Sequence, residues 1–172
     1  DIFVSNIADN YALHESHFLY INNGNVKETK KGIAPFENKS EQYGLSRSSW
    51  GWDCKFGDFN NDKIAEAIQA TGFVKGTKSR WPELQELATL NDEFLSNLSY
   101  WPKIQPGDDI SGNSHLFFFS RDKKGHFYDI SNKINLNENQ ISRGIAISDV
   151  DHDGKLDFAV SNQWEDSKFY KN

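Results

Sequence analysis

The chain has 172 residues, with 19 Lys and Arg against 25 Asp and Glu, which gives a formal net charge of -6. This acidic balance argues against a nucleic-acid-binding surface, because phosphate binding draws its affinity from clustered Lys and Arg. The apolar runs reach about five residues, whereas a membrane-spanning helix needs roughly 20. The composition therefore predicts a soluble globular protein without a membrane span.

Cysteine and aromatic content narrow the fold class. The single cysteine, Cys54, excludes an internal disulfide and a cysteine-based zinc site. Aromatic residues make up 14% of the chain, and they fall mostly in short alternating or apolar runs, which favour β-strands. We therefore predict an all-β protein.

Three segments along the chain share one rhythm, an acidic residue followed by a short apolar strand. They are Asp1 to Asn6, Glu66 to Thr71 and Asp157 to Asn162. Each is followed by a second, aromatic strand, and these are His17 to Ile21, Leu116 to Phe119 and Lys168 to Tyr170. The pattern predicts three units of one repeat, at residues 1–50, 51–130 and 131–172.

Turns and one helix complete the predicted elements. Asn22-Asn23-Gly24-Asn25 and Arg121-Asp122-Lys123-Lys124-Gly125 are turn signals that suit hairpins. In residues 82–98 apolar residues recur every three to four positions, which predicts a helix. A segment of approximately residues 75–113 is thus predicted to form an insertion between strands of the second unit.

A run of alternating carboxylates precedes the last apolar strand. Asp149, Asp151 and Asp153 stand at positions one, three and five of a loop, and Gly154 follows where a sharp turn is needed. The carbonyl of Lys155 and the carboxylate of Asp157 complete a set of oxygen ligands of the kind that Ca2+ prefers.

An EF-hand shares the first six positions of this loop but requires a glutamate at position twelve and helices on both sides. Position twelve is Val160 here and Gln69 in the middle loop, which aligns without a gap over residues 58–66. The flanks are strand-like, so both loops are predicted to lie in β-hairpins.

These residues resemble the FG-GAP or VCBS repeats of integrin-like β-propellers, and most nearly the cartilage acidic protein and ASPIC/UnbV group. The matching segments are Gly51-Trp52 with Phe56 to Asp62, and Ser142 to Ala146 with Asp149 to Asp157 and Ser161-Asn162. The resemblance implies antiparallel four-stranded blades, about seven in a complete propeller, with calcium in the hairpin loops. It does not extend over residues 82–98.

The resemblance also implies a second calcium site, in the middle loop. Its ligands are Asp58, Asn60, Asp62, the carbonyl of Ile64 and Glu66. This loop departs from the pattern in having Lys63 where glycine is expected and Glu66 where aspartate is expected. A residue other than glycine at positive φ costs roughly 1 kcal/mol.

Asp1 aligns with the last ligand of such a loop, so the chain is expected to begin within a repeat and to hold about three blades of a propeller that needs roughly 4 to 8. The expected partners are the remaining blades or another copy of the chain, and a protein or carbohydrate ligand. The resemblance implies an extracellular, periplasmic or cell-surface scaffold, for example in cell adhesion.

No motif supplies a nucleophile, a base and an orienting group together, so no catalytic residue is predicted. An alternative is the propeller part of an ASPIC/UnbV-type biosynthetic enzyme, with a pocket built by the helical insertion. A further alternative is a calcium module with parallel strands stacked as a solenoid.

Overall fold

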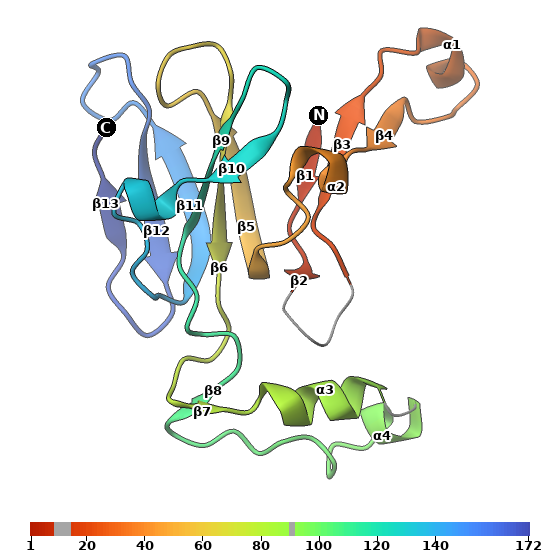
Figure 1. Ribbon diagram of the computed structural model, residues 1–172, viewed down its shortest axis with the longest axis vertical. Helices are drawn as coiled ribbons and strands as arrows, with labels where there is room; N and C mark the ends of the chain where they lie inside the picture. The colour runs from red at the N-terminus through yellow and green to blue at the C-terminus, as the bar shows by residue number, and fades with distance from the viewer. Residues whose placement is uncertain (9–14, 90–91) are drawn as a thin grey trace.

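β-Strands dominate the computed structural model, which describes residues 1–8, 15–89 and 92–172 (Figure 1). Strands account for 38% and helices for 14% of the residues, and the main sheets are antiparallel. The predicted all-β class is therefore confirmed, with the architecture of a partial propeller. The antiparallel pairing also argues against the solenoid alternative.

The middle sheet contains a complete blade of four antiparallel strands. These are β5 (Ser49–Gly57), β6 (Glu66–Thr71), β9 (Phe117–Arg121) and β10 (Phe127–Asp129). A fifth strand, β2 (Ile7–Ala8), comes from the start of the chain and pairs with β5. This short strand ties the first part of the chain to the middle sheet.

Two further sheets flank the middle sheet. The first sheet contains β1 (Ile2–Val4), β3 (Phe18–Asn22) and β4 (Phe36–Asn38). The last sheet contains β11 (Ser142–Ser148), β12 (Asp157–Asn162) and β13 (Lys168–Tyr170). All of their strand pairs are antiparallel.

The three sheets share one strand register. The residue that follows the acid at the start of each repeated strand is opposite an aromatic residue of the next strand: Ile2 opposite Tyr20, Ala67 opposite Phe119, and Phe158 opposite Tyr170. The hairpins before these strands also correspond, since Cys54 pairs with Gln69 and Ile145 pairs with Val160, 91 residues later (145 minus 54). The sheets are thus built on one plan.

Alternate residues of the middle sheet pack against different neighbours, as expected of a pleated strand buried on both faces. Ala67 and Phe119 belong to a buried cluster with Leu19 of the first sheet. Ile68 and Phe118 belong to a second cluster with Val160 of the last sheet. The sheets are therefore stacked face to face through two apolar cores.

The helical insertion leaves β6 and returns to β9 at the end of the sheets opposite the acidic loops (Figure 1). It contains α3 (Trp81–Thr89) and α4 (Asp92–Ser96), and a parallel pair of β7 (Lys78–Ser79) and β8 (Asp108–Asp109) closes its base. The single helix predicted over residues 82–98 is therefore wrong in part, and its residues 90–91 lie outside the described residues.

The predicted tight turn at residues 22–25 is also wrong in its length. Asn22 and Asn23 accept hydrogen bonds from the backbone N–H groups of Gly24 and Asn25, at 2.8 and 2.9 Å. These local bonds lead the chain into α1 (Val26–Thr29) before it returns to β4. Asparagine favours such local turns, so the connection from β3 to β4 contains a helical turn.

The remaining helices are short, namely α2 (Ser40–Tyr43) and the 3-10 turn η1 (Ser131–Lys133). Within the described part of the chain, no helix combines the length and the apolar character that crossing a membrane requires.

Candidate metal centre

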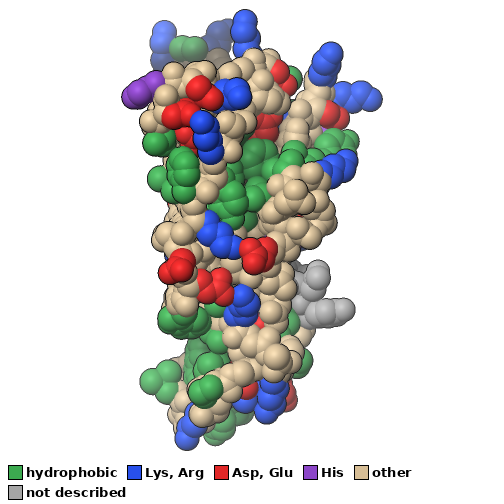
Figure 2. All heavy atoms as spheres, turned by 90° about the vertical axis from the view of Figure 1, so that its left-hand side faces the viewer, with side chains coloured by type: hydrophobic (Ala, Val, Ile, Leu, Met, Phe, Trp, Pro, Cys, Tyr) green, Lys and Arg blue, Asp and Glu red, His purple; other side chains and the backbone are tan. Residues whose placement is uncertain are grey.

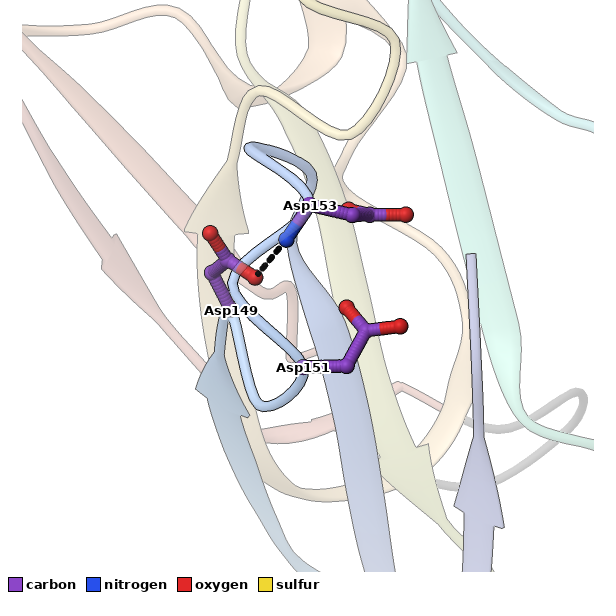
Figure 3. A group of neighbouring side chains, drawn as sticks. All are labelled: Asp149, Asp151 and Asp153. Atoms are coloured by element: carbon purple, nitrogen blue, oxygen red, sulfur yellow. Dashed lines mark hydrogen bonds between the residues drawn. The ribbon is translucent and has the colours of Figure 1, made fainter.

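The loop between β11 and β12 brings three carboxylates together. One side-chain oxygen from each of Asp149, Asp151 and Asp153 lies within 4.8 Å of the others. The Asp149 carboxylate faces the backbone N–H of Asp153, while the side chains of Asp151 and Asp153 extend to the same side of the loop (Figure 3). Like charges at this separation repel each other, and a bound cation would remove that repulsion.

Backbone N–H groups hold the loop in this curled form. The two carboxylate oxygens of Asp149 accept hydrogen bonds from Asp153 and Gly154, at 3.1 and 2.9 Å. Asp153 accepts one from the backbone of Lys155 at 3.0 Å. Gly154 has φ of 86°, a left-handed conformation that glycine adopts without steric cost.

The middle loop, between β5 and β6, repeats this hydrogen-bond pattern. Asp58 accepts from the backbone of Asp62 and Lys63, at 3.0 and 2.8 Å, and Asp62 accepts from Ile64 at 2.7 Å. Lys63 occupies the position of Gly154 and has φ of 72°. The fold thus imposes the same turn on a residue that has a Cβ atom.

The acids at the ninth position of the loops are the most deeply buried. Asp157 is 1% exposed and Glu66 is 3% exposed. Each accepts a hydrogen bond from the second residue of its loop: Asp157 from Val150 at 3.0 Å and Glu66 from Phe59 at 2.9 Å. These carboxylates therefore anchor the bases of the two loops, and burial raises the pKa of Glu66.

Asn60 supplies an amide where the last loop has Asp151. Its side-chain N–H donates to Glu66 at 3.0 Å, and its side-chain oxygen accepts from the backbone of Asp62 at 2.9 Å. The middle loop consequently carries less negative charge at its tip than the last loop, and the predicted site there has fewer free oxygen donors.

A lysine already contacts the three-carboxylate group. Lys171 forms an ion pair with Asp151, and this hydrogen-bonded partner lowers the pKa of the Asp151 carboxyl. Lys155 is more distant, with its ammonium nitrogen 4.0 Å from Asp153. A metal ion that used Asp151 as a ligand would compete with Lys171.

All ten predicted ligand residues lie in these two hairpin loops or at the strands that they enter. The structure gathers the carboxylates of three of them, Asp149, Asp151 and Asp153, into one group. The backbone N–H groups of Lys155 and Ile64 are hydrogen-bonded within their loops. Oxygen donors of this kind suit a hard divalent cation such as Ca2+.

The two loops also touch, which the sequence alone did not indicate. The side-chain amide of Asn61 donates a hydrogen bond to the carbonyl of Gly154 at 3.0 Å. Asn172, after the last strand, donates from its backbone to Asp157 at 2.9 Å and from its side chain to the carbonyl of Phe59. The loops therefore form one continuous acidic end of the molecule.

A cavity of about 330 Å³ adjoins the middle loop, between the middle and last sheets. Its lining comes from segments far apart in the chain, so no local sequence motif signals it. A search of protein-family models and of curated proteins gives no match to this chain.

Proposed function

We propose that the chain is a calcium-binding segment of an FG-GAP/VCBS-type β-propeller, acting as a structural and ligand-binding scaffold in an extracellular or envelope protein. The observation that carries the proposal is the group of Asp149, Asp151 and Asp153 at a hairpin tip. Calcium bound there would stabilise the hairpin, because it would hold the three carboxylates together. A cage of oxygen ligands that leaves no position open favours a structural role for the ion over a catalytic one.

Supporting evidence comes from the two hairpins together. They share strand register, hydrogen-bond pattern and the left-handed turn at Gly154 and Lys63. A plain acidic turn does not need the same three backbone bonds to carboxylates at both sites. The predicted second site, in the middle loop, remains the weaker candidate because Asn60 and Glu66 are bonded to each other.

Thermal unfolding with a chelator, Ca2+ or Mg2+ tests the proposal. A ligand at 100 times its dissociation constant adds about 2.7 kcal/mol, which shifts the midpoint of a chain of this size by about 5 to 10 °C. We expect Ca2+ to raise the midpoint more than Mg2+, and Asp153→Ala to remove most of the gain.

Asp166→Ala is the matched control, since Asp166 is exposed and lies outside both loops. It removes the same charge and should leave the calcium effect intact. If chelation and calcium addition leave the midpoint of a metal-free sample unchanged, the loops are only acidic turns and the proposal fails.

The outward faces of the first and last sheets support the proposed partners. Ile2 and Val4 of the first sheet are 46% and 41% exposed, and Phe169 of the last sheet is 55% exposed. In the shared register, Ile2 corresponds to Ala67 of the middle sheet, and Phe169 corresponds to Phe118 of the middle sheet. Ala67 and Phe118 are both buried between sheets. We propose that further blades, or another copy of the chain, cover these faces.

The alternative, an ASPIC/UnbV-type enzyme, requires a pocket beside the inserted helices. The 330 Å³ cavity is lined by residues of 59–66, 118–136 and 158–172, at the acidic end of the molecule, whereas α3 and α4 lie at the opposite end. This cavity therefore lends no support to a pocket built by the inserted helices.

A further inference from the structure

The cavity beside the middle loop has mainly apolar and aromatic walls. Its aromatic lining comes from Phe59, Phe118, Phe158 and Tyr170. Ile130, Ile134 and Leu136, around η1, form the aliphatic side. Figure 2, which views the molecule from the left-hand side of Figure 1, shows hydrophobic side chains gathered just below acidic groups near its upper end. At about 330 Å³ the cavity falls within the range of small-molecule sites.

The rings are held in fixed orientations by one another. Phe59 meets Phe118 and Phe158 edge to face, with centroids 5.3 and 5.9 Å apart. Tyr170 stacks on Phe158 with centroids 4.6 Å apart. Such mutual packing keeps a wall of aromatic rings in place, and aromatic rings attract cations electrostatically.

One charged group of this cavity has no counter-charge. Within residues 1–8, 15–89 and 92–172, no ammonium or guanidinium group pairs with Glu66, whose carboxylate accepts hydrogen bonds from the Phe59 backbone and the Asn60 amide. Lys171 also lines the cavity, but its ammonium is paired with Asp151. A carboxylate 3% exposed without a counter-ion is costly.

The surrounding charge has the same sign. The two loops carry seven carboxylates, against three lysines at Lys63, Lys155 and Lys171. The negative potential of this end favours cations and disfavours anions.

We propose that the cavity binds a small organic ammonium ion with an aromatic or branched apolar body. The ammonium group would interact with Glu66 and the aromatic rings, and the apolar body would lie against the aliphatic side. Each carboxylate oxygen of Glu66 accepts one hydrogen bond in the structure, and an oxygen has capacity for a second. Glu66 is also a predicted ligand of the middle loop, so an organic ammonium ion and a calcium ion in that loop would compete for it, whereas the group of Asp149, Asp151 and Asp153 takes no part in the cavity.

The test uses three probes that share a phenylethyl body and differ in the charge of the head group: phenethylammonium, 2-phenylethanol and 3-phenylpropanoate. Each is titrated into the complete chain at pH 7 in chelating buffer, followed by calorimetry and by NMR. We expect the ammonium probe to bind about tenfold more tightly than the alcohol, and the carboxylate to bind most weakly.

Two variants locate the binding. Glu66→Gln should weaken binding of the ammonium probe about tenfold while leaving the affinity for the alcohol nearly unchanged. Ser120→Phe, at a half-buried position of the lining, should fill the cavity and abolish binding of every probe. Glu86→Gln, on the exposed side of α3, is the matched charge control and should bind like the original chain.

Three outcomes would overturn the proposal, provided that thermal melts show each variant to be folded. One is equal or tighter binding of the carboxylate probe, and another is unchanged ammonium binding by Glu66→Gln. The third is lack of binding by all probes up to about 10 mM, which is weaker than ordinary specific recognition. Because calcium is chelated throughout, none of these results bears on Asp153→Ala.

Discussion

At the scale of single residues, His17 is the most unusual ionisable group. It is fully buried between the first and middle sheets, and its Nδ1 atom accepts a hydrogen bond from the Asn6 backbone at 2.9 Å. Gln69 lies 3.1 Å from the same nitrogen. Burial, assisted by Arg47, lowers the pKa of His17 from 6.5 to about 4. The ring is thus neutral at pH 7.

This shift predicts a pH dependence of stability. The unfolded chain takes up a proton on His17 near pH 6.5, but the folded chain does so only near pH 4. The free energy of unfolding should therefore fall as the pH falls through this window, by about 3 kcal/mol in total. Urea unfolding at several pH values measures it.

Other carboxyl groups also titrate in this range, so the comparison is made between variants. His17→Gln should show a smaller loss of stability between pH 7 and pH 4 than the original chain. His152→Asn, at an exposed left-handed position of the last loop, is the control and should keep the full loss. Identical pH profiles for the original chain and His17→Gln would contradict the assignment.

At the scale of the loop, Lys171 predicts a measurable effect on calcium affinity at the proposed site. Because its ammonium pairs with Asp151, a calcium ion that used Asp151 as a ligand would have to displace it. Exposed ion pairs contribute about 0.2 to 1 kcal/mol, so Lys171→Gln should tighten calcium binding up to about fivefold.

Calcium titration by calorimetry checks this prediction. Lys168→Gln is the matched control, because Lys168 begins β13, the strand that Lys171 directly follows, but pairs with Glu138. It should leave the affinity of the last loop unchanged. Weaker calcium binding by Lys171→Gln would show that the lysine supports the site.

Local elements with a clear sequence signal were predicted well. β6, β12 and β13 have the predicted ends, because β6 and β12 each begin with an acid followed by a short apolar run, and β13 is a short aromatic run. Features that depend on distant segments were not predicted. Pairing of β2 with β5 joins residues about 40 apart in a strand of only two residues, which carries no periodicity.

In the candidate site, too, local patterns are predictable from the sequence and contacts between distant segments are not. Alternating carboxylates at Asp149, Asp151 and Asp153 are visible in the sequence, and the structure places them together. The ion pair with Lys171 and the contact between Asn61 and Gly154 cross from one segment to another. Trp81 is buried against Trp50, a contact between separate segments that no local sequence pattern indicates.

At the scale of the whole molecule, the outward faces of the first and last sheets predict association. Phe169→Lys and Val4→Lys place a charge on faces that correspond to buried positions of the middle sheet. Each should reduce self-association, measured by analytical ultracentrifugation over a range of concentrations. Val26→Lys, on the exposed helix α1, is the control. A chain that is monomeric at every concentration would contradict pairing with a second copy.

The shared register has a further consequence for protein engineering. In the last sheet the link between the second and third strands is residues 163–167, whereas in the middle sheet it is residues 72–116, which include the helical insertion. Both links join strands paired in the same way. The insertion is therefore exchangeable in principle: the short link should close the middle blade in its place, and other sequences should be graftable at the same two points.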